Sequence, residues 1–453
     1  MQITIPDKVK TIIGQLQDEG YEAYVVGGCV RDSVLGKVPN DWDITTNAEP
    51  ADVKRLFRRT IDVGIEHGTV VVMLGNDSYE ITTYRIDGDY EDSRHPSSVE
   101  FTKNLADDLK RRDFTMNAMA YNDKDGLVDL FGGIEDMNRR LIRAVGNPME
   151  RFSEDALRMM RAVRFSAQLG YAIETETEAA IQKLASTLSK ISAERIREEL
   201  EKLIVSPHPD RLRDAYRLGI TKAILPEWDV MMECTQHNLH HYTTVGEHTI
   251  DTLINCVDAD ADLNQKDRRT LRLTMLLHDV AKPVVKTLGD DCYEHFKGHP
   301  PKSAEMTKEI LRRLKYDNAT VKDVETLVMY HDDKPRLTMP KVRRFIIDTG
   351  VERMPIMIMI KRVDLAAHSD YLMDEKQEWQ QEFEQKVQKV IDDGDCLAIK
   401  DLALSGKDLI ELGIKPGPQL GNILNELMEY VIQDPKCNQR EKLLQRVKEI
   451  NEQ

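Results

Sequence analysis

Cysteine and long apolar stretches are both scarce in this chain of 453 residues. The six cysteines are scattered and form no Cys-x-x-Cys pair, which argues against a disulfide framework and against a cysteine-based zinc site. No run of about 18 apolar residues occurs, so we expect neither a membrane-spanning helix nor a membrane partner. The opening MQITIPDKVK lacks the apolar core of a secretory signal, which favours a cytoplasmic protein.

Positively charged residues are also fewer than acidic ones. The 63 lysines and arginines face 79 acidic residues, which gives a formal net charge of −16. A protein that coats nucleic acid without specificity is usually basic, so this composition argues against that class. An acidic chain can still bind RNA through local positive surfaces. The stretch from Arg139 to Arg164 holds seven arginines and three acidic residues, and it is a candidate for such a surface.

Two kinds of apolar pattern divide the chain. Up to about residue 145, strand patterns alternate with helical ones, and beyond about residue 148 only helical periodicity continues. Strands are expected at 21–28, 41–46, 67–74, 79–85 and 126–131, with helices at 51–59 and 104–120. Later helices are expected at 153–169, 174–187, 192–204, 208–218, 245–256, 268–280, 301–315, 319–330, 340–368 and 372–393. The predicted fold is α+β, with a mixed α/β head followed by an all-helical body.

Paired acids stand out in the segment DWDITT. If this segment is a strand, Asp41 and Asp43 lie on one face, because strand side chains alternate. Two carboxylates side by side suit a divalent cation, and Mg²⁺ prefers one or two carboxylates together with substrate phosphates. A solvated acidic edge is the alternative reading of the pair taken alone.

Phosphate-binding features surround the acid pair in sequence. Gly27 and Gly28 follow a buried strand and let a ligand approach the backbone, while Arg31 follows within one turn. Arg112, in RRDFTMNA, is expected to open a helical stretch, and its guanidinium can hold a phosphate if the pocket lies nearby. Glu80 is either a third carboxylate at this pocket or an ordinary strand-surface residue.

A ridge of charged residues follows at 155–164. Asp155, Arg158, Arg161 and Arg164 recur every three residues, as on one side of a helix. A carboxylate accepts hydrogen bonds and a guanidinium donates them. The first two residues together would therefore accept the pairing edges of cytosine and adenine and reject those of uracil and guanine, which leaves the last two arginines for phosphates. An ion-paired surface helix is the alternative.

These motifs together resemble the class II CCA-adding tRNA nucleotidyltransferases of the polymerase-β superfamily. The matching stretches are GGCVRD at 27–32, DWD at 41–43, RRDFTMNA at 111–118, EDALRMMRAVRF at 154–165 and ERIREEL at 194–200. The resemblance covers about residues 20–225, and LSGKDLIELGIKPGPQLGNIL at 404–424 resembles the family's C-terminal tail.

The resemblance implies template-independent addition of CCA to the 3′ end of tRNA, from CTP and ATP, by two-metal nucleotidyl transfer. It implies that Asp41 and Asp43 hold Mg²⁺ and that Asp155 with Arg158 forms an amino-acid template for the incoming base. The positions that would hold the triphosphate or sugar are Gly28, Arg31, Arg112, Arg161 and Arg164. The tRNA would be bound through its 3′ end and its acceptor and elbow region.

The polar segment RIDGDYEDSRHPSSVEF at 85–101 is expected to be a mobile loop. It occupies the place of the loop that such enzymes use when they change from C to A addition. Its full length favours complete CCA addition. An enzyme that adds only CC or only A, and a poly(A) polymerase, stay open as alternatives.

A second set of residues resembles the HD phosphohydrolase superfamily, in which histidines and aspartates bind a divalent metal. The matching residues are His248, His278, Asp279, His299, His331 and Asp364. Imidazole and carboxylate ligands suit a transition metal, and the expected chemistry is phosphate-ester hydrolysis at RNA ends. Alternatively these are capping or core residues. His237, His240 and His241 are interpreted as structural.

The predicted domains are a polymerase-β-like head (1–147), a helical neck that selects the nucleotide (148–225), an HD body (226–370) and a helical tRNA-binding tail (371–453). Two alternatives of other classes are an HD hydrolase whose head only binds nucleotide, and a noncatalytic RNA-binding module. An intact Asp-x-Asp motif argues against both. The sequence leaves the oligomeric state open.

Overall fold

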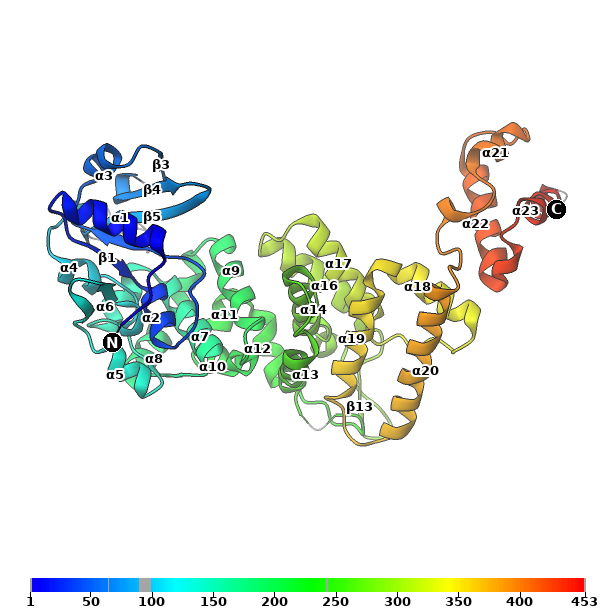
Figure 1. Cartoon of the computed structure of the whole chain (residues 1–453). Helices are drawn as coiled ribbons and strands as arrows, with labels where there is room; N and C mark the ends of the chain where they lie inside the picture. The colour runs from blue at the N-terminus through cyan, green and yellow to red at the C-terminus, as the bar shows by residue number, and fades with distance from the viewer. Residues whose placement is uncertain (1, 64, 89–98, 242, 452–453) are drawn as a thin grey trace. The chain divides into compact units, whose positions relative to one another are not determined.

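The structure is a computed structural model that describes residues 2–63, 65–88, 99–241 and 243–451. The chain divides into two compact units, Met1–Asp229 and Val230–Gln453. In Figure 1 the first unit runs from blue to green and the second from green to red. The finer division into four domains stays a prediction.

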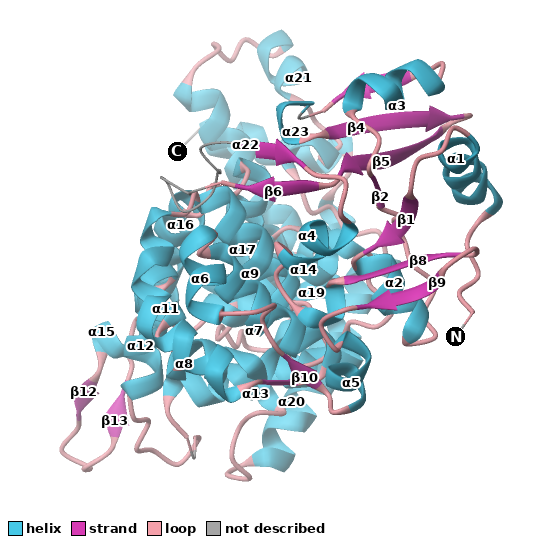
Figure 2. Cartoon of the chain, turned by 90° about the vertical axis from the view of Figure 1, so that its left-hand side faces the viewer, coloured by secondary structure: helices cyan, strands magenta, loops and turns pink. Residues whose placement is uncertain are grey.

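A mixed sheet organises the first unit. Within the described residues its spatial order is β3-β4-β5-β2-β1-β8-β9, and Figure 2 shows the part from β4 to β9. The strands are β1 (Ala23–Val26), β2 (Ile44–Thr46), β3 (Thr60–Asp62), β4 (Thr69–Leu74), β5 (Asp77–Thr83), β8 (Met119–Asn122) and β9 (Gly126–Asp129). β2 runs parallel to β5, whereas β1 pairs antiparallel with both β2 and β8. The predicted α/β head is confirmed.

The helix predicted over 104–120 is wrong. Helix α4 (Leu105–Lys110) ends early, and β8 then enters the sheet between β1 and β9. The apolar run MNAMAY fits a helix or a strand by composition alone, and periodicity cannot separate the two in so short a run. Sheet pairing on both sides decides it, because all four residues of β8 are buried.

The loop predicted over 85–101 is described only at its two ends. There β6 (Arg85–Asp87) and β7 (Val99–Phe101) pair antiparallel as a small separate sheet. Residues 89–98 lie outside the described residues.

Helices make up the rest of the first unit. They are α1 (Asp7–Asp18), α2 (Gly28–Val34), α3 (Pro50–Leu56), α5 (Gly133–Asn138), α6 (Pro148–Glu154), α7 (Leu157–Leu169), α8 (Thr175–Leu184), α9 (Ala193–Ile204), α10 (Leu212–Arg217), α11 (Ile220–Ile224) and α12 (Pro226–Glu233). The strands β10 (Leu141–Ile142) and β11 (Ala172–Ile173) pair in parallel beside them.

The single helix predicted over 153–169 is wrong as well. Helix α6 ends at Glu154, Asp155 has an extended backbone with φ of −135°, and α7 begins at Leu157. The Asp155 carboxylate accepts a hydrogen bond of 3.1 Å from the backbone N–H of Leu157. The acid therefore caps the start of a new helix, which is a preferred place for aspartate.

The second unit is almost entirely helical in its described part. Its helices are α13 (Val245–Ala259), α14 (Gln265–Leu277), α15 (Lys282–Val285), α16 (His299–Arg313), α17 (Asn318–Tyr330), α18 (Met339–Thr349), α19 (Met354–Leu365), α20 (Met373–Asp392), α21 (Gly406–Glu411), α22 (Pro418–Gln433) and α23 (Arg440–Asn451). The strands β12 (Thr287–Leu288) and β13 (Glu294–His295) form one short hairpin.

The sequence predicts one helix over residues 340–368, but the structure has two helices there. Helix α18 ends at Thr349, and Gly350 follows with φ of +96°, a backbone conformation that favours glycine. Helix α19 then begins at Met354. The break allows the second half of the segment, which carries Asp364, to run in a different direction from the first half.

The end of the chain has an apolar core of its own. Leu404, Leu409, Leu427, Val431 and Leu443 are completely buried in one cluster formed mainly by α21, α22 and α23. All six cysteines of the chain are free thiols. Among the described residues, no helix is both long and apolar enough to cross a bilayer.

Candidate functional site

Asp41 and Asp43 lie directly before β2 rather than within it, which corrects the predicted strand 41–46. The backbone carbonyl of Asp43 nevertheless accepts a hydrogen bond of 3.0 Å from the N–H of Val26 on β1. The chain at Asp43 thus already runs beside β1. This contact holds the second acid at the edge of the sheet.

A hollow of about 230 Å³ opens at this edge and brings the third acid to the pair. Asp43, Glu80, Arg111 and Arg112 line it. Glu80 belongs to β5, and the register Ile44↔Ile81 sets it beside the residue that precedes β2. Glu80 is therefore part of the same site, a point on which the sequence left two readings open.

The carboxylates of this hollow, which we call the head site, disfavour one another. Partial loss of hydration raises the pKa of Asp43, Arg112 opposes the rise, and Asp41 adds to it. Loss of hydration and the charges of Asp43 and Asp41 likewise raise the pKa of Glu80. A divalent cation removes this repulsion, and an all-oxygen donor set is what Mg²⁺ prefers. The residues present therefore fit such an ion.

Gly27 and Arg112 meet at the start of α2. Gly27 has φ of +82°, and a Cβ atom on it would lie 3.1 Å from Nη1 of Arg112. Arg112 does not open a helix, as the sequence suggested, but follows the end of α4. There the buried Asp108 holds it at 3.3 Å and also binds Arg111 at 2.7 Å. The same carboxylate thus aims two guanidinium groups toward the hollow.

Asp113 connects the glycine turn to α7. Its carboxylate accepts hydrogen bonds from Asn117 at 3.1 Å and from Nε of Arg161 at 2.8 Å. Asn117 in turn accepts a hydrogen bond of 2.8 Å from Arg31. Burial alone would raise the pKa of Asp113, but Arg161 and Asn117 lower it to about 2. Sequence reasoning did not identify Asp113 as a site residue, although it lies within the matching motif RRDFTMNA.

Asp155 and Arg158 do not face one another along one helix. Asp155 ends α6, and its second oxygen is 2.7 Å from a guanidinium nitrogen of Arg195 on α9. Arg158 instead pairs with Glu154 at 2.6 Å and donates a hydrogen bond of 2.8 Å to the backbone carbonyl of Arg111. The predicted ridge is therefore a junction of two helices braced by a third.

Three arginines converge on the ring of Phe165. The guanidinium carbons of Arg31, Arg161 and Arg164 lie 5.0, 5.4 and 3.6 Å from its centre. Such cation–π contacts orient guanidinium groups. Arg164 is almost buried, and Glu199 of α9 holds it at 2.8 Å. Both predicted phosphate-binding arginines of α7 are thus already paired with acids in this structure.

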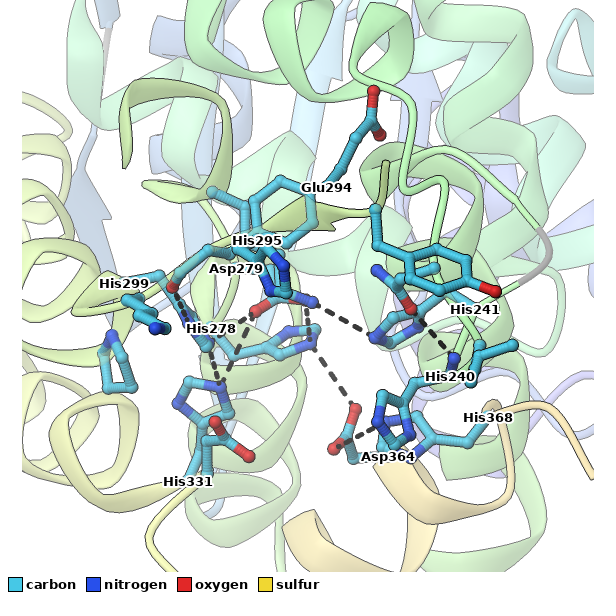
Figure 3. A pocket seen from close by; sticks show the side chains of 18 of the residues that line it. His240, His241, His278, Asp279, Glu294, His295, His299, His331, Asp364 and His368 are labelled. Atoms are coloured by element: carbon cyan, nitrogen blue, oxygen red, sulfur yellow. Dashed lines mark hydrogen bonds and ion pairs between the residues drawn. The ribbon is translucent and has the colours of Figure 1, made fainter. Parts of the chain in front are cut away.

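The six residues that resemble an HD centre come together in the second unit, and we call them the His/Asp cluster. Figure 3 shows five of them, all except His248. His248 lies on α13, His278 and His331 follow the last residues of α14 and α17, His299 begins α16, and Asp364 lies on α19. The chain thus collects ligand-type side chains from five helices.

Two ligand groups share this cluster. In the first, Nε2 of His248 is 3.1 Å and Nε2 of His278 is 3.7 Å from Oδ1 of Asp364. In the second, Oδ1 of Asp279 is 3.2 Å from Nε2 of His299 and 3.6 Å from Nε2 of His331. Asp279 also lies 3.2 Å from His278, so it stands between the two groups.

Backbone carbonyls orient three of the imidazoles. Nδ1 of His278, His299 and His331 lies 2.7, 2.9 and 2.7 Å from a carbonyl oxygen one turn earlier. That contact fixes the tautomer with Nδ1 protonated and turns the lone pair of Nε2 inward, as at metal-binding histidines. Nε2 of His278 is buried and lies 3.2 Å from Oδ2 of Asp279 without forming a hydrogen bond of good geometry. This donor set fits a transition metal.

Sequence reasoning missed three neighbours of the cluster. His368 lies 3.5 Å from Oδ2 of Asp364, and the ligand atoms of His241, His248 and His368 lie within 4.8 Å of one another. His241 therefore faces the cluster, which its structural interpretation did not anticipate. Lys282 is buried and pairs with Asp279 at 2.6 Å. Lys282 lies in LLHDVAKP, three residues after Asp279, and this spacing could have identified it as a neighbour of the cluster.

A pocket of about 520 Å³ opens onto the His/Asp cluster. Four lysines line it, namely Lys282, Lys297, Lys334 and Lys376. Positive side chains around a metal-type ligand set suit an anionic substrate such as a phosphate ester.

Comparison with protein families gives three matches along the chain. The Poly A polymerase head domain matches residues 23–143, the “Probable RNA and SrmB- binding site of polymerase A” matches 170–232, and tRNA nucleotidyltransferase domain 2 matches 301–447. The first match contains the whole head site.

Individual relatives agree with the family matches. The CCA-adding enzyme of Lactobacillus helveticus is 35% identical over 438 residues, which cover 94% of this chain and 94% of that protein. The CCA-adding enzyme of Lactiplantibacillus plantarum is 54% identical over 200 residues, or 44% of this chain and 49% of that protein. The crystal structure of the Bacillus stearothermophilus CCA-adding enzyme in complex with CTP is 29% identical, with a TM-score of 0.72 over 98% of both chains.

Proposed function

The chain belongs to the family of CCA-adding enzymes, and from that premise we propose that its head site adds C, C and A to the 3′ end of tRNA, using CTP and ATP. The observation that carries this proposal is the convergence of Asp43, Glu80 and Arg112 on one hollow, with Asp41 close enough to shift the ionisation of the first two. Carboxylates for a cation beside guanidinium groups for a triphosphate are the parts that nucleotidyl transfer requires.

Nucleotidyltransferases of this family depend on a divalent metal. We infer that the ion here is Mg²⁺ and that Asp41 and Asp43 hold it, with Glu80 as a further carboxylate at the same hollow. When bound, Mg²⁺ neutralises charge on the attacking and leaving oxygens of an in-line displacement. The residues around it bind and orient the triphosphate. Gly28 gives backbone room beside the phosphates, while Arg31 and Arg112 supply the positive charge.

Base selection is proposed to take place at the junction of α6 and α7. Asp155 accepts a hydrogen bond from Arg195, and its carboxylate oxygens keep further lone pairs for the exocyclic amino group of cytosine or adenine. Arg158, fixed by Glu154 and a backbone carbonyl, donates to the ring nitrogen. Arg161 and Arg164 lie further along α7 and would contact the triphosphate or the sugar.

The direct experiment offers the purified chain three tRNA substrates, which lack CCA, end in C or end in CC, with each nucleoside triphosphate and Mg²⁺. We expect extension of all three to CCA with CTP and ATP only. Extension of only the CC-ended tRNA would instead define an A-adding enzyme, and unlimited A addition a poly(A) polymerase. No extension of any substrate would refute the proposal.

We propose phosphate-ester hydrolysis at the His/Asp cluster as a second activity. The observation in its favour is the inward-facing Nε2 of His278, which lies beside two carboxylates without a well-formed hydrogen bond, within a set whose other rings are similarly oriented. A divalent transition metal held there would activate water for attack on phosphorus. The P–O ester bond breaks as the new P–O bond forms, and the released alcohol takes up a proton. Phosphorylated RNA ends are the expected substrates.

Hydrolysis is tested with small phosphomonoesters and with RNA ending in a 3′-phosphate or a 2′,3′-cyclic phosphate, in the presence of Mn²⁺, Co²⁺ or Ni²⁺. We expect metal-dependent turnover that chelation abolishes and that Asp364→Asn lowers at least tenfold. The matched control is Asp332→Asn, which changes an acid in the pocket lining outside the ligand groups. Equal activity of all three proteins would contradict the proposal.

We further propose that this chemistry takes place in the cytoplasm, where tRNA and nucleoside triphosphates are available. Six free thiols suit a reducing compartment. The head, neck, HD body and tRNA-binding tail remain our proposal for how the two compact units divide.

A further inference from the structure

A second hollow lies beside the His/Asp cluster, against α20. Its volume is about 200 Å³, and Leu365, Leu372 and Trp379 form its apolar wall. His331, Asp364, His368, Lys334 and Lys376 line both this hollow and the larger pocket. The two hollows therefore meet at the cluster.

Trp379 is held rigidly. Its indole stacks on Phe383, with ring centres 5.1 Å apart and an angle of 9° between the planes. Phe383 is completely buried and packs edge-on against Phe345 at 5.3 Å. One face of the indole is thus occupied from within the protein. A fixed aromatic ring with leucines beside it offers a flat apolar surface, on which planar rings stack well.

The two hollows share part of their lining, including His331, Asp364 and Lys376, so a ligand in the smaller hollow can extend into the larger one. The smaller hollow has the apolar wall, and the larger one has Lys282 and Lys297 in addition. A flat apolar ring therefore suits the wall, and a charged group suits the lysines.

Lys376 lies where the two hollows meet. Its Nζ atom is buried and has no hydrogen-bond partner, although an ammonium group can donate three hydrogen bonds. Loss of hydration and the charge of Lys334 lower the pKa of Lys376. A buried ammonium that lacks a partner favours an anion at this point. An anion there would lie between the apolar wall and the His/Asp cluster.

We propose that the hollow of Leu365, Leu372 and Trp379 binds the base of a nucleoside phosphate whose phosphate group lies at Lys376 beside the His/Asp cluster. The inference rests on the hydrolysis proposed above and deepens it by naming the substrate class. Trp379 is then a specificity-determining residue and Lys376 a phosphate ligand. Free nucleotides and the terminal nucleotide of an RNA share this chemistry.

Binding can be measured without any reaction. The chain has three tryptophans, so a Trp42→Phe background leaves the completely buried Trp228 and Trp379. We expect CMP to quench the fluorescence of this full-length variant in a saturable way, and we expect the quench to be lost when Trp379→Phe is added. A quench that survives in the double variant, or no quench in the background variant, would overturn the inference.

Kinetics provide the second test. With Mn²⁺ present, Trp379→Ala should raise the KM for CMP or for a short RNA ending in a 3′-phosphate at least tenfold, and leave hydrolysis of glycerol 2-phosphate unchanged. The two nucleotide substrates distinguish free nucleotides from RNA ends. Ile391→Ala, which changes an exposed apolar residue of the same helix outside both hollows, is the matched control.

The outcomes separate the two proposals. An equal loss with all three substrates would make Trp379 merely structural and refute the inference, while the proposed hydrolysis would stand. If the wild-type chain hydrolyses none of them, the proposed hydrolysis fails, and the fluorescence titration alone decides whether the base-binding hollow exists.

Discussion

At the scale of single residues, two adjacent acids at the end of α6 differ in their ion-pair partners. Asp155 is held by Arg195, whereas its neighbour Glu154 pairs with Arg151 and Arg158. Adjacent carboxylates thus have different tasks. Both side chains are only partly exposed, so the two acids differ in their partners rather than in their accessibility. In the proposed function, Asp155 accepts from the incoming base and Glu154 orients arginines.

The first prediction concerns Asp155→Ala. The variant should lose about tenfold in its preference for CTP over UTP, because the acceptor for the exocyclic amino group is gone. The KM for CTP should change less, since the triphosphate contacts remain. Single-nucleotide addition to tRNA that lacks CCA measures both quantities. Glu150→Ala, an exposed acid on α6, is the control, and undiminished discrimination in Asp155→Ala would refute the template assignment.

The second prediction uses the titration of Asp113. Its pKa is lowered from 3.8 to about 2 in the folded chain. Stability from this depressed pKa is fully present above the unfolded value and is lost as pH falls through about 2. Asp113→Asn should therefore lower the free energy of unfolding by about 2 kcal/mol at pH 7 and by progressively less between pH 4 and pH 2.

Denaturant unfolding at a series of pH values measures this difference. Asp123→Asn is the control, because that acid forms a half-exposed ion pair with Lys10 and accepts a long hydrogen bond of 3.2 Å from Tyr121, and such exposed pairs contribute little. A difference between Asp113→Asn and the wild type that stays constant down to pH 2 would contradict the assigned network.

At the scale of elements, helix α9 braces the junction of α6 and α7 through two ion pairs. Arg195 and Glu199 lie four residues apart on it, so they share one face. The first holds Asp155 and the second holds Arg164. One helix thus sets the orientation of both a carboxylate and a guanidinium of the proposed nucleotide site. The motif ERIREEL is identifiable in the sequence, but its partners are not.

In the second unit, α19 braces α17 in a similar way. Lys361 is buried, and its ammonium donates hydrogen bonds of 2.9 and 2.7 Å to the backbone carbonyls of His331 and Asp333. Asp364 lies one turn later on α19. The lysine therefore connects the helix that carries Asp364 to the helix end that presents His331.

The third prediction is Lys361→Met, which keeps most of the side-chain volume and removes the charge. The end of α17 should loosen, and affinity of the His/Asp cluster for Mn²⁺ should fall roughly tenfold, as is typical when an outer-shell partner is lost. Isothermal titration calorimetry with Mn²⁺ measures this affinity. Lys308→Met, which breaks only a surface pair with Glu325, is the control. Unchanged affinity in Lys361→Met would show that His331 needs no such support.

At the scale of the whole molecule, each compact unit holds one complete set of chemical groups. The head site draws only on the first unit, and the His/Asp cluster draws only on the second. Neither set needs a side chain from the other. The two activities should therefore be separable by substitution.

The fourth prediction tests this separation. Asp41→Asn with Asp43→Asn should abolish nucleotide addition and leave phosphate-ester hydrolysis within about twofold of the wild type, whereas Asp364→Asn should do the reverse. Both reactions are measured on the same protein preparations. Joint loss of both activities in either variant, with thermal unfolding unchanged, would refute two independent sites.

The sequence alone predicted the α/β head and the helical body, which the structure confirms, and it named candidate residues that the structure brings together at the head site and in the His/Asp cluster. These predictions depend on local patterns, such as alternation in a strand, glycines before a helix, and acids or histidines in recognisable order. Glu80 and His241 show the limit of that reasoning. Their residue types suggest several roles, and only their neighbours in space decide among them.

What the tertiary structure decided is which local pattern prevails where two are compatible with the same residues. Residues 119–122 became β8 because strands were available for pairing on both sides. The helix over 153–169 broke at Asp155 because that carboxylate caps α7 and meets Arg195 of α9. The meeting of Trp379 and Lys376 with the His/Asp cluster is likewise long-range. Residue type and spacing are local properties and can be read from the chain, whereas pairing partners, burial and ionisation depend on segments that only folding brings together.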